Sequence, residues 1–160
     1  MSRLLECSTL VSVILTKVKK SLKKNTPFLA IISFNNSTYC KLLIDKCLGL
    51  DIHFKHYNLD NPNTSDIISL IDELNKDDEI TGILLVEPLP KNIDKYACYD
   101  EININKDIDG VNPINQYYLS INRPNIVNST VLAVIKILES YNISLSGKNV
   151  TIIGRSYNIS

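Results

Sequence analysis

The sequence predicts an α/β protein in which helices cover both faces of a parallel sheet. Short apolar runs of strand length alternate along the chain with longer segments whose apolar residues recur at helical spacing. The apolar runs are nearly continuous, which is typical of strands buried on both faces. Clusters of Asn, Ser, Pro and Gly separate the segments. This alternation favours a doubly wound, three-layer α/β/α architecture with right-handed crossovers, in which ligands bind beyond the carboxyl ends of the strands.

The first half of the chain supplies one helix and two strand–helix units. Residues 4–22 carry apolar side chains at mostly helical spacing, and an Asn-Thr-Pro turn ends that helix. Residues 28–33 form a continuous apolar run, and we expect a buried strand there. A turn then precedes a predicted helix over residues 39–50, which ends near a glycine. Residues 51–59 alternate as a second strand does, and a further helix is expected over residues 64–74.

The second half continues the alternation. A third buried strand is predicted over residues 80–86 and a helix over residues 93–102. Residues 105–119 are rich in turn formers and predict a loop. Residues 129–143 have strong helical periodicity, and a last strand is expected over residues 150–153. The expected N-terminal caps are Thr64 or Ser65 for the third helix and Ser129 for the last.

The bulk composition excludes several classes of protein. The 160 residues carry 17 basic and 17 acidic side chains, so no net field favours nucleic acid or an anionic membrane. No apolar run reaches the roughly 18–20 residues that span a bilayer, and the N-terminal segment lacks the cleavage site of a signal peptide. The four cysteines have no CxxC spacing and there are only two histidines. We therefore expect a cytoplasmic protein with reduced thiols and no metal.

Two loops that follow predicted strands hold candidate site residues. The stretch ILLVEPLP places Glu87 at a strand exit stiffened by two prolines, and the alternative is a rigid strand end without further role. The stretch NKDIDG places Asp107 and Asp109 beside Gly110, in a turn whose backbone N–H groups can keep a carboxylate ionised. Such a carboxylate could accept hydrogen bonds from the paired N–H donors of a 2-aminopyrimidinone ring. The alternative is an Asx-turn with solvated acids.

A third stretch, SGKNVTIIGRS, predicts a strand that leads into a phosphate-binding turn. Gly154 allows close backbone approach there, and Arg155 and Ser156 could contact phosphate. In their order and spacing, the three stretches together resemble the bifunctional methylenetetrahydrofolate dehydrogenase/methenyltetrahydrofolate cyclohydrolase family. That family has a Pro-Leu-Pro segment after a strand, a Lys-Asp-Val/Ile-Asp-Gly loop and a Gly-Arg-Ser loop. The resemblance covers nearly the whole chain.

The resemblance implies a division of the chain and an activity. It implies a folate-binding catalytic lobe over residues 1–128, an inter-lobe helix over 129–145 and the first strand of a truncated NADP-binding Rossmann domain over 146–160. The family oxidises 5,10-methylenetetrahydrofolate with NADP and hydrolyses 5,10-methenyltetrahydrofolate to 10-formyltetrahydrofolate, in the one-carbon metabolism that serves purine biosynthesis. The resemblance also implies a homodimer.

The site residues implied by the resemblance are partly replaced. The family's Tyr-x-x-x-Lys pair falls on Tyr39 and Leu43, its Gln on Val86 and its pterin-binding Asp on Asp109. Tyr39 and Asp109 are therefore the expected catalytic residues. Leu43 stands where the family has its Lys, and Val86 stands where it has its Gln. Valine can neither donate nor accept a hydrogen bond, so it cannot replace the Gln. Lys46 is a possible substitute amine, although it lies roughly 10 Å from Tyr39 along a helix. The expected substrate-binding residues are Tyr39, Leu43, Leu85, Val86, Glu87 and Asp109, and the expected cofactor-binding residues are Gly154, Arg155 and Ser156.

Three hypotheses about function follow. The first hypothesis is a diverged enzyme of one-carbon folate metabolism. The second, its main alternative, is a catalytically inactive folate-binding or dimerisation lobe. The third is a generic α/β interaction domain. NADP is expected by resemblance, but a dinucleotide site needs the helix after the glycine turn, so the site is incomplete in these 160 residues. The last dozen residues are accordingly expected to be poorly tied down.

Overall fold

A three-stranded parallel sheet forms the centre of the fold in the computed structural model, which describes residues 4–35 and 37–153. The strands β1 (Phe28–Phe34), β2 (His53–Leu59) and β3 (Gly82–Leu85) lie in the order β2-β1-β3. Both pairings are parallel, which confirms the predicted architecture. The loop after the fourth helix adds a single parallel bridge between Ile83 and Asp107, so this loop extends the sheet beyond β3.

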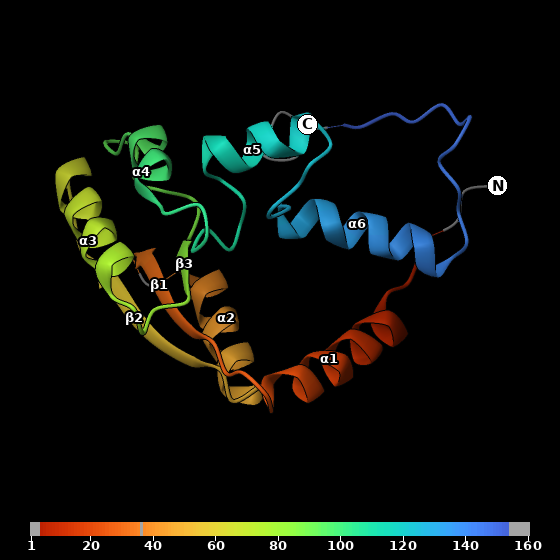
Figure 1. The fold of residues 1–160 in the computed structure, drawn as a ribbon, viewed down its shortest axis with the longest axis horizontal. Coiled ribbons are helices and arrows are strands. Elements are labelled where there is room, and N and C mark those ends of the chain that lie inside the picture. Colours follow the sequence, from red (N-terminus) through yellow and green to blue (C-terminus); the bar gives the residue numbers. More distant parts are fainter. Residues whose placement is uncertain (1–3, 36, 154–160) are drawn as a thin grey trace.

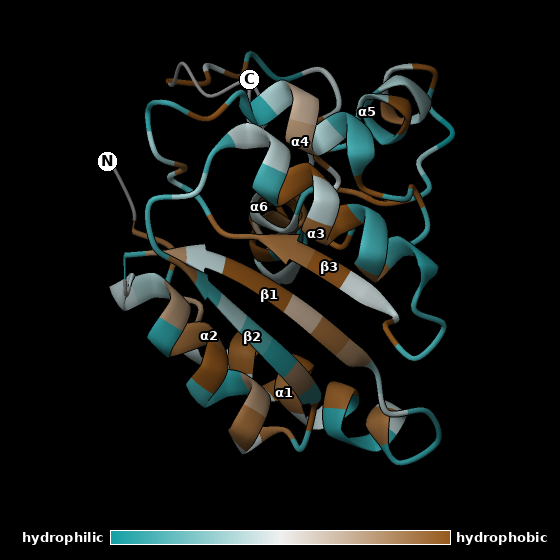
Figure 2. Ribbon diagram, turned by 90° about the vertical axis from the view of Figure 1, so that its left-hand side faces the viewer, coloured by the Kyte–Doolittle hydropathy of each residue, from teal (hydrophilic) through white to brown (hydrophobic). Residues whose placement is uncertain are grey.

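Helices cover both faces of the sheet (Figure 1). The helix α2 (Thr38–Gly49) packs on one face, and α3 (Thr64–Lys76) and α4 (Lys95–Glu101) pack on the other. Successive strand residues point to opposite faces, so Ile31 joins the α2 side and Ile32 the α3 side. Figure 2 shows the central strand β1 as largely hydrophobic and the edge strand β2 as largely hydrophilic, as their positions require.

Two helix caps differ from those expected. A capping box begins α3, because Asn63 accepts from the Asp66 N–H at 3.0 Å while Asp66 accepts from the Asn63 N–H at 2.9 Å. The expected caps Thr64 and Ser65 are already helical. Likewise Asn128, rather than Ser129, caps α6 (Ser129–Ser140). In both cases an asparagine just before the expected cap satisfies the unpaired N–H groups of the first turn.

The prediction of a loop over residues 105–119 was wrong for the second half of this range, where the structure has the helix α5 (Pro113–Ser120). Asn112 caps this helix by accepting the Ile114 N–H at 2.8 Å, and Pro113 stands at the first helical position. Proline is favoured there because its fixed φ suits the helix and its missing N–H would be unpaired anyway. The Asn-Pro pair was therefore a helix start rather than a loop signal.

The predicted strand over residues 150–153 is not formed. Val150 and Ile153 are 58% and 96% exposed, and no neighbouring strand is within pairing reach in the described part of the chain. An isolated strand has no ladder to stabilise it. Residues 154–160, which make up most of the segment expected to be poorly tied down, lie outside the described residues.

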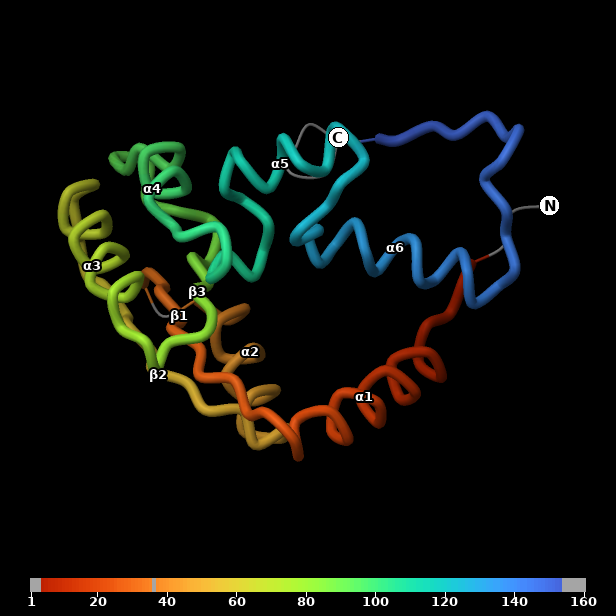
Figure 3. The backbone as a smooth tube through the Cα atoms, viewed as in Figure 1, coloured from red at the N-terminus to blue at the C-terminus, as the bar shows by residue number. Residues whose placement is uncertain are grey.

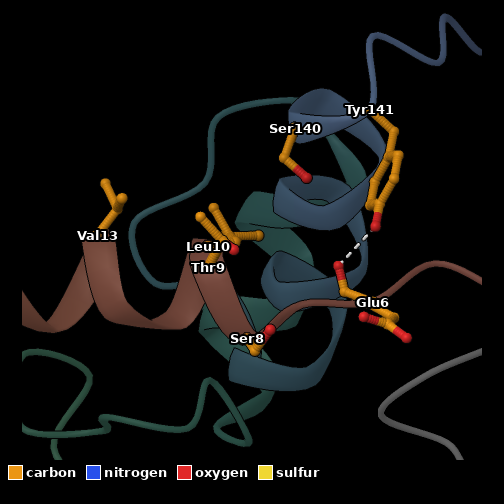
Figure 4. A pocket seen from close by; sticks show the side chains of 7 residues that line it. All are labelled: Glu6, Ser8, Thr9, Leu10, Val13, Ser140 and Tyr141. Carbon is orange, nitrogen blue, oxygen red and sulfur yellow. Dashed lines mark hydrogen bonds between the residues drawn. The ribbon is translucent and has the colours of Figure 1, made fainter.

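The helices α1 (Ser8–Leu22) and α6 lie side by side, away from the sheet (Figures 1 and 3). Neither contributes a buried residue, and the Tyr141 hydroxyl joins them by donating to the Glu6 carbonyl at 2.7 Å. A hollow of about 370 Å³ between them is shown in Figure 4, lined by Glu6, Ser8, Thr9, Leu10, Val13, Ser140 and Tyr141. It contains none of the predicted site residues. No helix in the described ranges has the length and apolarity needed to cross a bilayer.

Candidate functional site

The carboxyl ends of β1 and β3 are held next to each other. The Val86 N–H donates to the Ile32 carbonyl at 2.8 Å, directly after β3 ends. The helix α2 starts from the turn after β1, and its N-cap Ser37 accepts the Cys40 N–H at 3.5 Å. Tyr39, in the first turn of α2, is 57% exposed. An aromatic face is thus presented at the edge of the sheet where ligands of such folds bind.

Leu43 and Val86 meet in one apolar cluster, although they come from different elements. This cluster on the α2 face also contains Ile31 and Cys40, and Val86 is only 2% exposed. Neither side chain can donate or accept a hydrogen bond. The resemblance assigns these two positions to a Lys and a Gln, so two apolar side chains of one cluster stand where a polar pair is implied.

Glu87 and Leu85 lie on the other side of the β3 end. Leu85 is buried in the main core with residues of α3 and α4, whereas Glu87 is exposed. The hydroxyl of the buried Tyr99 donates to the Glu87 carboxylate, which fixes this carboxylate against α4. Sequence reasoning missed Tyr99, because its contact with Glu87 depends on how α4 packs.

Asp107 organises the loop that carries Asp109. Its side chain is fully buried and accepts from the Val111 N–H at 3.1 Å, the Asn112 N–H at 2.9 Å and the Asn115 amide at 2.8 Å. A buried carboxylate is tolerated when backbone and amide donors satisfy it in this way. Asp107 is therefore a structural anchor rather than an open ligand site.

Two glycines allow segments to pack closely around Asp109. A Cβ at Gly82 would lie 2.5 Å from a methyl group of Ile108, so glycine is needed for this side chain to cover β3. Gly110 has φ +65°, and a Cβ there would press on the backbone of residues 126–128 at 3.2–3.5 Å. That close approach brings the start of α6 against the Asp109 loop.

The start of α6 supplies hydrogen bonds to Asp109. The Ser129 hydroxyl donates to Asp109 Oδ1 at 3.1 Å, and the Asn128 amide donates to the Asp109 carbonyl at 3.1 Å. Burial raises the pKa of Asp109, the Ser129 hydrogen bonds lower it, and the charges of Asp107 and Glu87 raise it further. Sequence reasoning gave Ser129 only a capping role and missed these contacts with Asp109.

The remaining predicted residues lie apart from this arrangement. Lys46 is exposed in the last turn of α2, about two turns beyond Tyr39. Gly154, Arg155 and Ser156 lie outside the described residues. In the part of the chain that is described, no helix or strand follows α6.

Comparison with known proteins agrees with the motifs. Residues 5–109 match the family model for the tetrahydrofolate dehydrogenase/cyclohydrolase catalytic domain. The bifunctional protein FolD of Helicobacter hepaticus is 38% identical over 136 residues, covering 82% of this chain and 48% of its own. FolD of Acetivibrio thermocellus is 33% identical over 158 residues, covering 94% of this chain and 55% of its own. The chain thus spans about half the length of the curated relatives it matches.

Solved structures of similar sequence share the fold. The FolD methylenetetrahydrofolate dehydrogenase/cyclohydrolase of Campylobacter jejuni superposes with a TM-score of 0.87 at 32% identity, covering 98% of this chain and 59% of that one. A 5,10-methylenetetrahydrofolate dehydrogenase of the silkworm Bombyx mori superposes with a TM-score of 0.91 at 30% identity, covering 99% and 59%. Nearly the entire chain therefore adopts the fold of a little over half of these proteins.

Proposed function

Because the chain belongs to the tetrahydrofolate dehydrogenase/cyclohydrolase family, we propose that it binds a reduced folate at the carboxyl ends of β1 and β3. The observation that carries this proposal is the setting of Asp109, which lies half-buried in a glycine turn and is held by Ser129. A carboxylate so placed can accept two N–H groups of the 2-aminopyrimidinone ring of a folate. The exposed ring of Tyr39 supplies an aromatic platform at the neighbouring strand end.

Calorimetric titration of the purified chain with a tetrahydrofolate analogue tests this proposal. We expect saturable one-to-one binding, and we expect Asp109→Asn to weaken it by at least about tenfold, because hydrogen bonds to a charged group contribute roughly 1.5–3 kcal/mol. The matched control is Asp78→Asn. Asp78 is an exposed carboxylate that precedes the amino end of β3, away from the proposed site, so its loss should leave the affinity unchanged. Absence of saturable heat, or an equal loss in the control, would contradict the proposal.

The second candidate is the bifunctional activity that the names of the relatives state. The family resemblance over most of the chain favours it, and the apolar pair Leu43 and Val86 opposes it. Loss of a general acid–base group commonly costs about 10²–10⁴ in rate. We therefore infer folate binding with little or no cyclohydrolase activity, and hydrolysis of methenyltetrahydrofolate clearly above the spontaneous rate would favour the second candidate instead.

The variant that combines Leu43→Lys with Val86→Gln probes the cause of this defect. If the missing amine and amide limit the chemistry, the double variant should hydrolyse methenyltetrahydrofolate about 10²-fold faster than the native chain. Leu42→Lys is the matched control, because Leu42 is 58% exposed on the same helix and should leave the rate unchanged. A double variant that folds by circular dichroism yet gains no activity would refute the explanation.

Cofactor, assembly and compartment complete the proposal. The Trypanosoma brucei enzyme, which shares this fold, was solved as a complex with NADP, and this supports NADP as the family's nucleotide. We also propose that the chain forms a homodimer, as the family resemblance implies. Sedimentation equilibrium would test this. The four free thiols in the described chain support the cytoplasm, where cysteines stay reduced.

A further inference from the structure

Two carboxylates flank the carboxyl end of β3. Glu87 follows this strand almost directly and is exposed to solvent. Asp109 lies in the loop whose bridge to Ile83 extends the sheet on the side of β3 away from β1. Tyr39 follows β1, the neighbour of β3 on the other side. Along this edge of the sheet the order of side chains is therefore Tyr39, Glu87 and Asp109.

A series of hydrogen bonds holds Glu87 in place relative to the Asp109 loop. The hydroxyl of Tyr99, a residue that is only 2% exposed, donates to the Glu87 carboxylate. The Asn112 amide donates to the Tyr99 carbonyl at 3.2 Å, and the Asn112 N–H donates to Asp107 Oδ2 at 2.9 Å. Buried groups of α4 and of the loop thus set the position of the Glu87 carboxylate, although the carboxylate itself is open to a ligand.

Neither carboxylate has a cationic partner in the described part of the chain. Neither Glu87 nor Asp109 forms an ion pair with a described residue. Lys106 belongs to the same loop, but its Nζ is bound to carbonyls at the end of α3. Leu43 carries no charge at the position that the resemblance assigns to a Lys. Burial raises the pKa of Asp109 most, and the charges of Asp107 and Glu87 raise it further, which agrees with a negative potential at this edge.

We propose that Glu87, positioned by Tyr99, makes the site select a folate whose one-carbon bridge is cationic. This inference rests on the folate binding proposed above. A ligand whose ring is anchored on Asp109 and which extends toward Tyr39 has to cross the end of β3, where Glu87 stands. The 5,10-methenyl bridge is an amidinium, with a positive charge shared by its two nitrogens, whereas the 5,10-methylene bridge is neutral. A carboxylate without a cationic partner therefore attracts the methenyl form and not the methylene form.

Such a preference favours retention of the cation over its hydrolysis. Hydrolysis adds water to the methenyl carbon, opens the bridge to the 10-formyl form and releases one proton, so the positive charge of the bridge disappears. An attraction that is strongest for the bound cation weakens along this path and therefore raises the barrier. The proposed selectivity thus agrees with the inference of little or no cyclohydrolase activity.

A comparison of two ligands of nearly equal shape tests the role of Glu87. The affinities of the full chain for 5,10-methenyltetrahydrofolate and 5,10-methylenetetrahydrofolate are measured by stopped-flow tyrosine fluorescence, before the cation hydrolyses. We expect the native chain to bind the methenyl form about tenfold more tightly. Glu87→Gln should remove this preference and leave the affinity for the methylene form unchanged, and it should fold because Glu87 is exposed. The matched control is Glu79→Gln, an exposed carboxylate before the amino end of β3, which should keep the native preference.

Tyr99→Phe tests the positioning role of the buried hydroxyl. This variant keeps the aromatic ring in the core but releases the Glu87 carboxylate, so the preference for the methenyl form should fall by about threefold. A purely structural role of Tyr99 would change the affinities for both ligands equally. An unchanged preference in folded Tyr99→Phe would therefore overturn the positioning role.

The outcomes separate this proposal from folate binding itself. Equal affinities of the native chain for the two ligands, or an equal loss for both in Glu87→Gln, would overturn the charge selectivity and leave folate binding intact. Loss of the preference in Glu79→Gln would also overturn it, because the effect would then not belong to the end of β3. Binding of neither ligand would overturn the proposed function together with this inference.

Discussion

At Asp109, burial and hydrogen bonding act on the carboxyl group in opposite directions. Burial is the largest effect and raises the pKa above the ordinary value of 3.8, while the Ser129 hydrogen bonds partly counteract it. The folded chain therefore binds a proton at Asp109 more readily than the unfolded chain does. The stability that this proton contributes is fully present below the unfolded pKa and is lost as the pH rises through the folded pKa.

Folate affinity should show the opposite pH dependence from this stability term. Ligand N–H groups need the ionised form of Asp109, so affinity should fall by about tenfold per pH unit once the pH is below the raised pKa. Asp109→Asn should bind weakly with a flatter profile. A calorimetric pH series on both proteins checks this, and a native profile that breaks only below the ordinary aspartate value would contradict the assigned role of Asp109.

At the scale of elements, Lys106 joins the Asp109 loop to α3. Its Nζ donates to the carbonyls of Leu74 and Asn75 at 2.9 Å and of Asp77 at 2.7 Å, which satisfies the end of that helix. We expect Lys106→Met to lower the free energy of unfolding by about 1.5–3 kcal/mol, measured in urea. Lys76→Met, which removes an exposed ion pair on α3, should cost at most about 1 kcal/mol. Equal losses in the two variants would show that Lys106 has no special role.

At the scale of the whole molecule, stability should be unevenly distributed. The sheet with α2, α3 and α4 contains both apolar clusters, whereas α1 and α6 contribute no buried residue. We expect backbone amides of α1 and α6 to exchange hydrogen roughly tenfold or more faster than those of β1 and α3, because local opening there exposes little apolar surface. Hydrogen-exchange mass spectrometry on the native chain measures this. Protection of α1 equal to that of β1 would refute it.

The sequence by itself determined the strands and helices of the central layer, the loop that carries Asp109 and the family signature. These are local properties: the length of an apolar run, a turn residue or a short motif sets them within a few residues. The start of α5 was also written locally, in the Asn112–Pro113 pair, but the surrounding turn formers obscured it.

Only the tertiary structure decided which distant residues meet. It placed Leu43 and Val86 in one apolar cluster, Tyr99 against Glu87, and Ser129 against Asp109. The strand expected over residues 150–153 failed for the same reason, since a strand exists only where a neighbour pairs with it. Contacts between elements depend on how helices and strands pack, and no local pattern records that.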